Sequence, residues 1–512
     1  MTVAAAATDR MAQPTQGAGR ARPTTWPLLV VAVGLGVLTG LAPATAIVAV
    51  AAIGVLALVS TRPASAAYLW LLVTPLVVGI ERGRLLPVLR PNEALLLLLV
   101  VALAGRWAVL RVWRRAEHPH LALSRVDVGF LLLLLTGSAL PVLWMAARGA
   151  GVSADDVSAA SVVAKYYLLF LVFRLAVRSE RQVWWCLWAS MAAAVVVAVL
   201  AVLQSMDLLG VRELLAGFWG SSGGPAPGRG SATIGNAHGA ADFLTFNLAI
   251  SLALAFRQPA GRSARIALTL SAVFLLGALG SGQASSVIGL FVCLLALGWV
   301  LGRLPRVLAG GVVAAPLAVA ALAPVIAARL SSLDPSTGLP SSWLARWHNL
   351  STYFWPQLFD GYGWLLGVRA LPEAIGAEVW QPVVYIESGH TWFLWIGGVP
   401  YLLAFAIFIW IALRASRTAA REQGAFGVAG AAAFAAYCTV FVLTALDPHL
   451  FLRGSADIAV PLLALAITGA TRRHGDGPAD PGTPSDEVLD SRGTASSSHG
   501  ASREATAAAG GG

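Results

Sequence analysis

A glutamate and a histidine stand three residues apart near the end of a long polar stretch, in Glu387-Ser388-Gly389-His390. An imidazole has an ordinary pKa of about 6.5, so His390 can accept a proton near neutral pH. Glu387 can orient the ring or balance its charge if the segment is helical, because residues three apart lie on one helix face. A general base is one interpretation, and a solvated loop histidine is the other.

Arginines supply a second kind of chemistry, at Arg229, Arg346 and Arg369. A guanidinium group holds phosphate oxygens through two parallel hydrogen bonds and stays charged at physiological pH. Arg346 and Arg369 flank a stretch rich in tryptophan and tyrosine, which suits a membrane interface and also stacking on sugar rings. These arginines are therefore candidates for binding a lipid pyrophosphate, with contact to lipid headgroups as the alternative.

Lys165 is the only lysine of the chain, and it lies within an apolar run. At 1.5 Å per helical residue, it is about 9 Å from the outer end of that run. A charge at such a depth is a functional hypothesis by default, so Lys165 joins the candidate pyrophosphate ligands. The alternative is a side chain that extends to the interface.

The composition is typical of a membrane protein. Hydrophobic residues make up 57% of the chain and charged residues 12%, whereas about a quarter of an ordinary soluble chain is charged. Backbone groups in lipid must bond within their own segment, so apolar runs of near-span length are predicted to be helices. We therefore predict an all-α polytopic transmembrane bundle of about 12–14 spans over residues 26–471. The fourteen spans are placed at 26–42, 45–60, 65–80, 92–110, 127–147, 159–177, 182–205, 240–257, 265–281, 284–301, 307–328, 391–413, 424–446 and 454–471.

Two tails and one long loop are predicted outside these spans. Residues 1–25 and 472–512 are rich in small and polar residues, and we expect them to be disordered and cytoplasmic. With both termini inside, 24 arginines fall on the inner side and 10 on the outer side, as the positive-inside rule requires. The long loop over about 331–390 is then predicted to be extracytoplasmic, and we expect the membrane to be the cytoplasmic membrane of a bacterium.

Several function classes find no support in the sequence. Loop arginines that face anionic lipid explain the net charge of +10, so nucleic acid is not expected as a partner. No P-loop or dinucleotide fingerprint occurs, and no cofactor is expected. The three cysteines lie in apolar runs and the acidic pair Asp155-Asp156 is isolated, so no metal site is predicted. His238 and His449 are weaker candidate bases on other outer loops.

Short motifs occur in four stretches of the chain, namely residues 229–236, residues 280–286, residues 346–347 with 365–368, and residues 385–390 with 395–400. In this order they resemble the O-antigen ligase and O-antigen polymerase superfamily. Residues 229–236 are similar to a loop that leads into a family helix. Residues 280–286 are similar to a family helix start, with Gln283 where arginine is usual. Arg346-Trp347 with 365–368 resembles part of the family's large periplasmic loop. Residues 385–390 with 395–400 resemble the return of that loop into the next helix.

The resemblance implies a membrane glycosyltransferase that acts on the outer face of the membrane. Because the sequence shows no metal-ligand cluster, we expect this enzyme to be metal-independent. A glycan would pass from a polyprenyl-pyrophosphate-linked donor to a sugar hydroxyl, in the biosynthesis of a surface polysaccharide. His390 and Glu387 would be catalytic, because the acceptor proton needs a base. Cationic side chains would bind the departing pyrophosphate, and these are Arg346, Arg369, Arg229 and Lys165. The implied partners are the lipid-linked glycan, membrane lipids and other proteins of polysaccharide assembly.

Two alternatives stay open beside this interpretation. A lipid-linked glycan flippase or other polysaccharide transporter would need charges within many spans, and the sequence identifies Lys165 and Arg174. Another class of polyprenyl-linked glycosyltransferase usually carries an acid in its first outer loop, and residues 42–45 contain none. Within the superfamily, ligase and polymerase are both compatible with the sequence.

Overall fold

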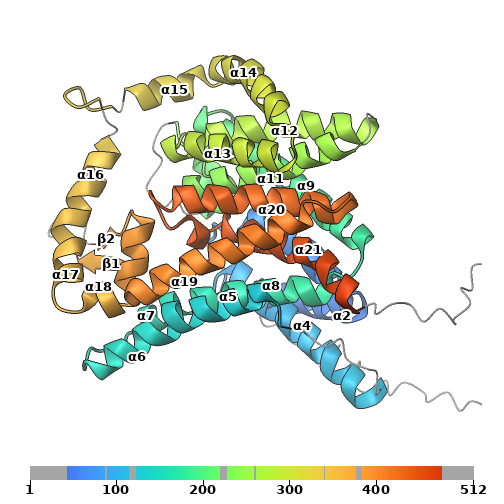
Figure 1. Ribbon diagram of the computed structural model, residues 1–512, viewed down its shortest axis with the longest axis horizontal. Coiled ribbons are helices and arrows are strands. Elements are labelled where there is room, and N and C mark those ends of the chain that lie inside the picture. The colour runs from blue at the N-terminus through green and yellow to red at the C-terminus, as the bar shows by residue number, and fades with distance from the viewer. Residues whose placement is uncertain are drawn as a thin grey trace, which may run out of the picture.

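A computed structural model describes residues 43–86, 89–114, 123–219, 228–258, 261–331, 333–338, 341–375 and 383–475. Over these ranges the chain is a bundle of helices with a single two-stranded sheet at one side (Figure 1). The first half contains α2 (Pro43–Thr61), α3 (Ser65–Val77), α4 (Pro91–Arg114), α5 (Arg125–Leu134), η1 (Leu135–Ala139), α6 (Leu140–Ala147), α7 (Ala154–Ala160), α8 (Val162–Ala176), α9 (Glu180–Ser205), α10 (Val211–Phe218), η2 (Ala232–Ile234) and α11 (Ala237–Arg257). The second half contains α12 (Arg262–Gly280), α13 (Ala284–Val300), α14 (Leu304–Ala321), α15 (Ala323–Leu330), α16 (Ser341–Asn349), η3 (Leu350–Phe354), α17 (Trp355–Phe359), α18 (Gly363–Leu366), β1 (Glu373–Ile375), β2 (Val383–Tyr385), α19 (Gly389–Ala419), α20 (Gly424–Leu443), η4 (His449–Phe451) and α21 (Ala456–Gly475).

The apolar runs form membrane-spanning helices. Within the described ranges, nine helices are long and apolar enough to cross a bilayer, and four shorter apolar helices accompany them. The predicted spans from 45–60 onward each coincide with one of these helices or with two consecutive helices, and the span at 26–42 lies outside the described residues. The prediction of an all-α, multi-pass membrane protein is confirmed.

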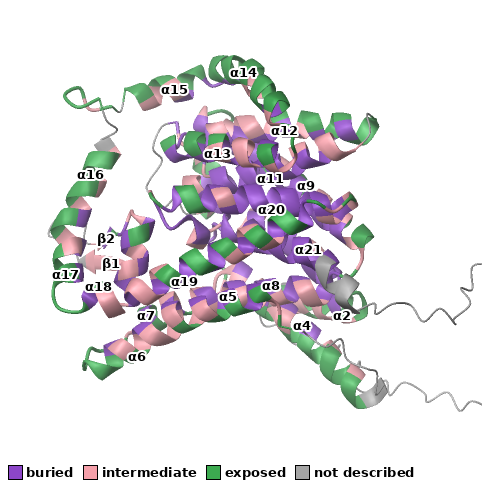
Figure 2. Cartoon of the chain, in the orientation of Figure 1, coloured by how far each residue is buried: buried purple, intermediate pink, exposed green. Residues whose placement is uncertain are grey.

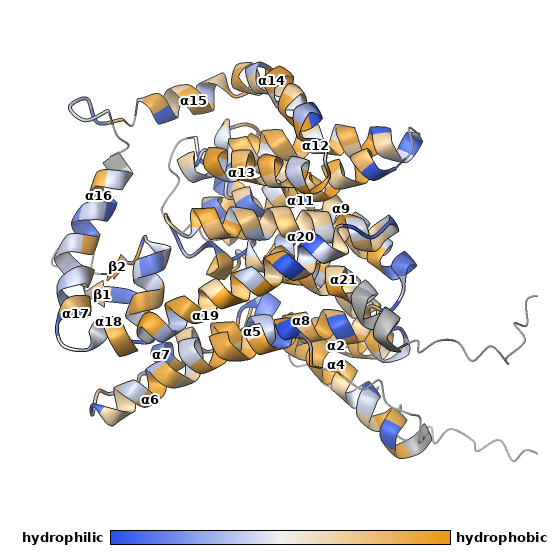
Figure 3. Cartoon of the chain, viewed as in Figure 1, coloured by the Kyte–Doolittle hydropathy of each residue, from blue (hydrophilic) through white to orange (hydrophobic). Residues whose placement is uncertain are grey.

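Apolar side chains on the outside of the bundle agree with this conclusion. Val112 on α4 is 73% exposed and Val312 on α14 is 75% exposed, although both helices are strongly apolar (Figure 3). Water disfavours such surfaces, whereas lipid tails cover them without cost. These two helices therefore present lipid-facing surfaces.

The centre of the bundle is formed by α11, α20 and α21, whose residues are mostly buried (Figure 2). Small residues allow close approach there, and α20 carries an unbroken run of glycine and alanine over residues 429–433. Polar side chains bond between neighbouring helices, with Ser190 Oγ 2.8 Å from Asn247 Oδ1 and Ser251 Oγ 2.8 Å from Ser271 Oγ. Close packing and these internal bonds fix α11 in place, and α11 carries part of the site described below.

Local sequence signals set several helix starts. Ser153 accepts a hydrogen bond from the Asp156 backbone N–H, and the Asp156 carboxylate accepts from the Ser153 N–H. This capping box starts a helix at Ala154, earlier than the predicted span at 159–177.

At the other end of the chain, α21 continues to Gly475, into the first residues of the predicted C-terminal tail. The remaining residues of both predicted tails lie outside the described ranges.

The stretch predicted as a long loop contains regular structure in its described residues. It begins directly after α15 and forms α16 to α18 and the β1–β2 hairpin, which pairs Glu373 with Tyr385, at one side of the bundle (Figure 1). The segment packs on a kink in α19 at Gly398, which has φ of +65°. A side chain at Gly398 would strike the Leu365 carbonyl, so glycine is required there. Docking at the kink fixes where α16 lies.

Candidate functional site

Arg346 on α16 joins two acidic segments that are distant in the sequence. Its Nε lies 3.3 Å from Glu387 Oε2, directly before α19. Its Nη2 lies 3.1 Å from Asp447 Oδ2, in the loop that follows α20. The side chain of Arg346 is only 15% exposed. A guanidinium bridge of this kind holds two carboxylates at fixed positions and leaves them partly neutralised.

Arg229 adds a second guanidinium to this cluster. It precedes η2 and lies close enough to Arg346 and Glu387 to interact electrostatically with both. Burial lowers the pKa of Arg229, Arg346 lowers it further, and Glu387 opposes both effects. Its Nε is buried and has no hydrogen-bond partner among the described residues. The loop is seated closely, because a side chain at Gly282 would strike the Gly228 carbonyl.

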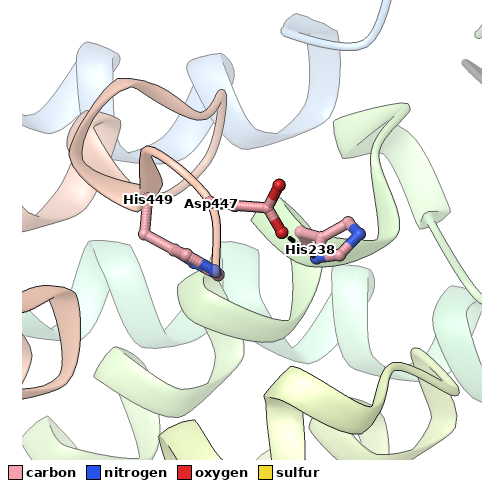
Figure 4. A group of neighbouring side chains, drawn as sticks. All are labelled: His238, Asp447 and His449. Carbon is pink, nitrogen blue, oxygen red and sulfur yellow. Dashed lines mark ion pairs between the residues drawn. The ribbon is translucent and has the colours of Figure 1, made fainter. Parts of the chain in front are cut away.

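Two histidines lie on the other side of Asp447. His238 stands in the first turn of α11, which Asn236 caps by accepting from the His238 N–H. The carboxylate of Asp447 points toward the His238 ring, with Oδ2 3.7 Å from Nδ1 (Figure 4). The same Nδ1 lies 3.3 Å from Ser285 Oγ, at the start of α13. The ring centroid of His449 is 6.1 Å from that of His238.

His449 forms a buried dyad with Asp242. Its Nδ1 lies 2.7 Å from Asp242 Oδ2, and its side chain is 1% exposed. Burial alone would lower the pKa of His449, but the Asp242 carboxylate outweighs burial, so the pKa is raised. Its Nε2 has no hydrogen-bond partner within the described part of the chain. The carboxylate thus orients the ring and leaves one nitrogen available to a ligand.

The two carboxyls that contact Arg346 favour protonation more than ordinary carboxyls do. Burial raises the pKa of Asp447, and Arg346 opposes that effect. The side chain of Glu387 is partly exposed, but the surrounding segments desolvate its carboxylate and raise its pKa. Arg346 opposes this effect, as it does at Asp447. A carboxylate with a raised pKa is a better proton acceptor than an ordinary one.

His238, Asp447 and His449 also make a candidate metal-ligand set. Each offers one ligand atom, and these atoms lie within 4.8 Å of one another (Figure 4). The Asp242–His449 bond resembles the carboxylate that often supports a metal-bound histidine. However, Arg346 Nη2 lies 3.1 Å from Asp447 Oδ2, so a metal ion bound there would meet the guanidinium charge. The arrangement therefore fits a site without a metal ion better. The sequence alone did not reveal that His238, Asp447 and His449 lie close together.

The structure brings together five of the residues that the sequence singled out. Arg346, Glu387 and Arg229 lie in one cluster, and His238 and His449 join it through Asp447. His390 lies in the first turn of α19 and is exposed. No hydrogen bond or ion pair joins His390 to Glu387 among the described residues. Instead, Glu387 is oriented by Arg346.

Arg369 and Lys165 lie elsewhere. The Arg369 Nε and Nη2 donate to the two oxygens of Asp156 at 2.7 and 2.9 Å, which makes a two-pronged ion pair. Arg369 also lines an open cavity of about 410 Å³ together with Arg148 and Glu373. Lys165 interacts electrostatically with a different set of charges, first of all Asp457 and Glu93. Both residues are therefore separate from the Arg346 cluster.

Sequence reasoning missed two acids of the site. Asp447 stands in the triplet Asp447-Pro448-His449 between two apolar helices, and this placement was the available signal. Asp242 lies near the start of a span, where an isolated acid is itself a functional hypothesis.

No protein-family model and no curated protein matches this chain.

Proposed function

We propose that this protein transfers a glycan from a polyprenyl-pyrophosphate-linked donor to a sugar hydroxyl, as a member of the O-antigen ligase and polymerase superfamily. The reaction takes place on the outer face of a bacterial cytoplasmic membrane, with both termini in the cytoplasm. The segment between α14 and α19 is then extracytoplasmic. This orientation follows from the arginine distribution, which favours the inner side by 24 to 10.

The observation that carries this proposal is the convergence of the stretches on which the resemblance rests. The loop at 228–229 packs on Gly282. His238 contacts Ser285, and Arg346 pairs with Glu387. These contacts unite parts of the chain that are far apart in sequence around one cluster of cationic and acidic groups. A hydropathy pattern alone gives no reason for such convergence.

The cluster has the groups that glycan transfer requires. The acceptor hydroxyl oxygen forms a bond to the anomeric carbon of the donor while the bond from that carbon to the pyrophosphate oxygen breaks. The pyrophosphate leaves with the electron pair, and Arg346 and Arg229 stabilise its negative charge. The acceptor proton passes to the Glu387 carboxylate, whose raised pKa suits this role. His390, exposed beside it, is the second candidate base.

A lipid-linked glycan flippase is the second candidate function. The sequence pointed to Lys165 and Arg174 as charges within spans, but several acids lie there too. Asp242 and Asp457 are buried in α11 and α21, and charges spread over several spans are typical of transport proteins. A transporter would move the lipid-linked glycan without forming a new glycosidic bond.

An assay of the purified chain separates the two functions. The protein is reconstituted in nanodiscs with a polyprenyl-pyrophosphate-linked oligosaccharide and an acceptor glycan. A new glycosidic product supports transfer. Lipid movement in proteoliposomes without any product would establish transport instead. A reporter fused after Gly338 should be active only outside the cytoplasm, and cytoplasmic activity would contradict the proposed orientation.

A further inference from the structure

An open cavity of about 410 Å³ lies between the turn that follows α6 and the segment that contains the β1–β2 hairpin. Figure 1 shows α6, α17 and the hairpin at one side of the bundle. The lining includes four polar side chains and two large apolar ones, namely Arg148, Gln357, Arg369, Glu373, Met145 and Trp395. The volume lies within the range of about 300–1,000 Å³ that is typical of small-molecule sites. None of the lining residues belongs to the Arg346 cluster.

The two walls of the cavity are joined to each other by polar contacts. Asp156, which is 0% exposed, accepts from Arg369 Nε at 2.7 Å and from Arg369 Nη2 at 2.9 Å. The Leu371 N–H donates to the same carboxylate at 3.3 Å. On the other wall, the Arg148 guanidinium donates to the Val368 carbonyl. These bonds hold the turn after α6 against the segment before β1, so the cavity is preformed, as ligand sites usually are.

Both donors and acceptors remain available in this cavity. The Glu373 carboxylate forms no hydrogen bond or ion pair within the described part of the chain, although it lines the cavity. Gln357 donates its Nε2 to the Tyr353 carbonyl at 2.8 Å, which leaves its Oε1 as an acceptor. Arg148 uses Nη2 for a backbone carbonyl, so the other N–H groups of its guanidinium remain as donors. A ligand that both donates and accepts hydrogen bonds would match this set.

The charges around the cavity favour a neutral ligand over an anionic one. Arg369 is paired with Asp156. The charge of Arg148 is balanced by the unpaired Glu373, and Asp155 is a further acid that interacts electrostatically with Glu373. A phosphate or pyrophosphate needs a surplus of positive charge, which these residues do not provide. Sugar hydroxyls are neutral, and each can donate and accept a hydrogen bond.

The apolar part of the lining also suits a sugar. Trp395 lines the cavity although it is only 2% exposed, so it lies deep, and its Nε1 donates to the Leu371 carbonyl at 3.0 Å. Met145 adds a second apolar side chain. The C–H groups of a sugar ring can pack on such side chains while its hydroxyls face the polar groups.

We propose that this cavity is a glycan subsite, in which Arg148, Gln357 and Glu373 bind a neutral sugar unit. The ligand class rests on the proposed function, which brings glycans to this protein. The subsite also lies near the Arg346 cluster, because α16, η3 and α17 follow one another directly and carry both Arg346 and Gln357. These two residues are eleven positions apart, which is about 16 Å at 1.5 Å per helical residue. A glycan of several sugars can therefore extend from the cluster into the cavity, as part of the donor or of the acceptor.

Binding of free oligosaccharides tests the subsite without turnover. The full chain is labelled with a fluorophore, reconstituted in phosphatidylcholine nanodiscs and applied to an array of neutral and acidic oligosaccharides from bacterial surface polysaccharides. We expect the wild type to bind neutral oligosaccharides, and Glu373→Gln and Arg148→Gln each to weaken that binding at least about tenfold. Glu213→Gln and Arg84→Gln are matched controls. Glu213 is an exposed acid outside the cavity, and Arg84, like Arg148, is an exposed arginine that donates to a backbone carbonyl.

The transfer assay then identifies which glycan occupies the cavity. Glu373→Gln removes no contact with the described residues, so its melting temperature should equal that of the wild type. A KM for the acceptor glycan that rises about tenfold in Glu373→Gln would assign the sugar to the acceptor. The same rise in the KM for the lipid-linked donor would assign it to the donor. Either result supports the subsite.

Each outcome decides the proposal. No bound oligosaccharide, binding of acidic oligosaccharides alone, or undiminished binding by Glu373→Gln would overturn it. If Arg148→Gln fails to fold, Glu373→Gln still decides. An oligosaccharide whose binding depends on Glu373, without any glycan transfer by the wild type, would support the subsite and reject the proposed function. Glycan transfer with unchanged KM for both substrates in Glu373→Gln would support the proposed function and reject the subsite.

Discussion

Arg346 Nη2 lies 3.1 Å from Asp447 Oδ2, and this ion pair ties α16 to the loop between two central helices, α20 and α21. Through Asp447, the contact extends to His238 at 3.7 Å. The bridge therefore connects the segment docked on the α19 kink with the buried centre of the bundle. A ligand that draws Arg346 away from Asp447 changes the charge balance of both.

Replacing Arg346 with lysine tests the need for a guanidinium. Lysine keeps the charge but presents a single ammonium group, which cannot reach Glu387 and Asp447 together in the same geometry. We expect Arg346→Lys to lower glycan transfer on the order of 10²-fold, the usual effect of removing one donor to a developing negative charge. Arg84→Lys is the control, because Arg84 is exposed and donates to the Gly217 carbonyl, not to a carboxylate. Wild-type rates from Arg346→Lys at normal protein levels would assign Arg346 to structure alone.

The pH dependence of transfer should report Glu387. Burial raises the pKa of this carboxyl, and Arg346 lowers it. A base must be deprotonated, so the rate should fall as pH drops through a pKa above the ordinary glutamate value. Removing the cation in Arg346→Gln should raise that pKa further and move the acidic limb to higher pH. A limb that stays in place, or moves to lower pH, would contradict the assignment of Glu387.

Chelation tests the metal-ligand set. Because the Arg346 guanidinium charge lies 3.1 Å from the Asp447 oxygen that an ion would need, transfer should survive prolonged treatment with EDTA. His449→Gln should not change this resistance. Full loss of activity in EDTA, restored by one divalent metal in the wild type but not in His449→Gln, would establish a metal centre at His238, Asp447 and His449.

Gly398 tests how the site segment is held. At φ of +65° a side chain is strained by about 1–3 kcal/mol, and here it would also meet the Leu365 carbonyl. Gly398→Ala should lower the melting temperature and reduce transfer, because α18 can no longer dock on α19. Gly302→Ala is a matched control, since Gly302 has φ of +63° with nothing nearby. Equal losses from both variants would mean that strain, not the lost docking, is responsible.

Hydropathy was sufficient to predict the apolar helices, nine of which in the described ranges are long enough to span a bilayer, because lipid demands long apolar helices whatever their neighbours are. Hydropathy did not predict that this helical region begins at Ala154, because the Ser153 capping box is polar and lies outside the apolar run. The site was only partly predictable. Arg346 and Glu387 were identified by residue type and by the resemblance, but Asp447 and Asp242 join them through helix packing that no local pattern encodes. Lys165 was grouped with Arg346 for its charge, although the fold places it among other residues.

Glycan transfer by the Glu387→Gln variant tests the central claim most directly. The amide keeps the shape of the side chain but cannot accept the acceptor proton. With purified protein in nanodiscs, a polyprenyl-pyrophosphate-linked donor and an acceptor glycan, we predict product from the wild type and about 10²–10⁴-fold less from Glu387→Gln. His390→Ala, measured beside it, should have a smaller effect. No product from folded wild-type protein, or equal rates from wild type and Glu387→Gln, would contradict the account.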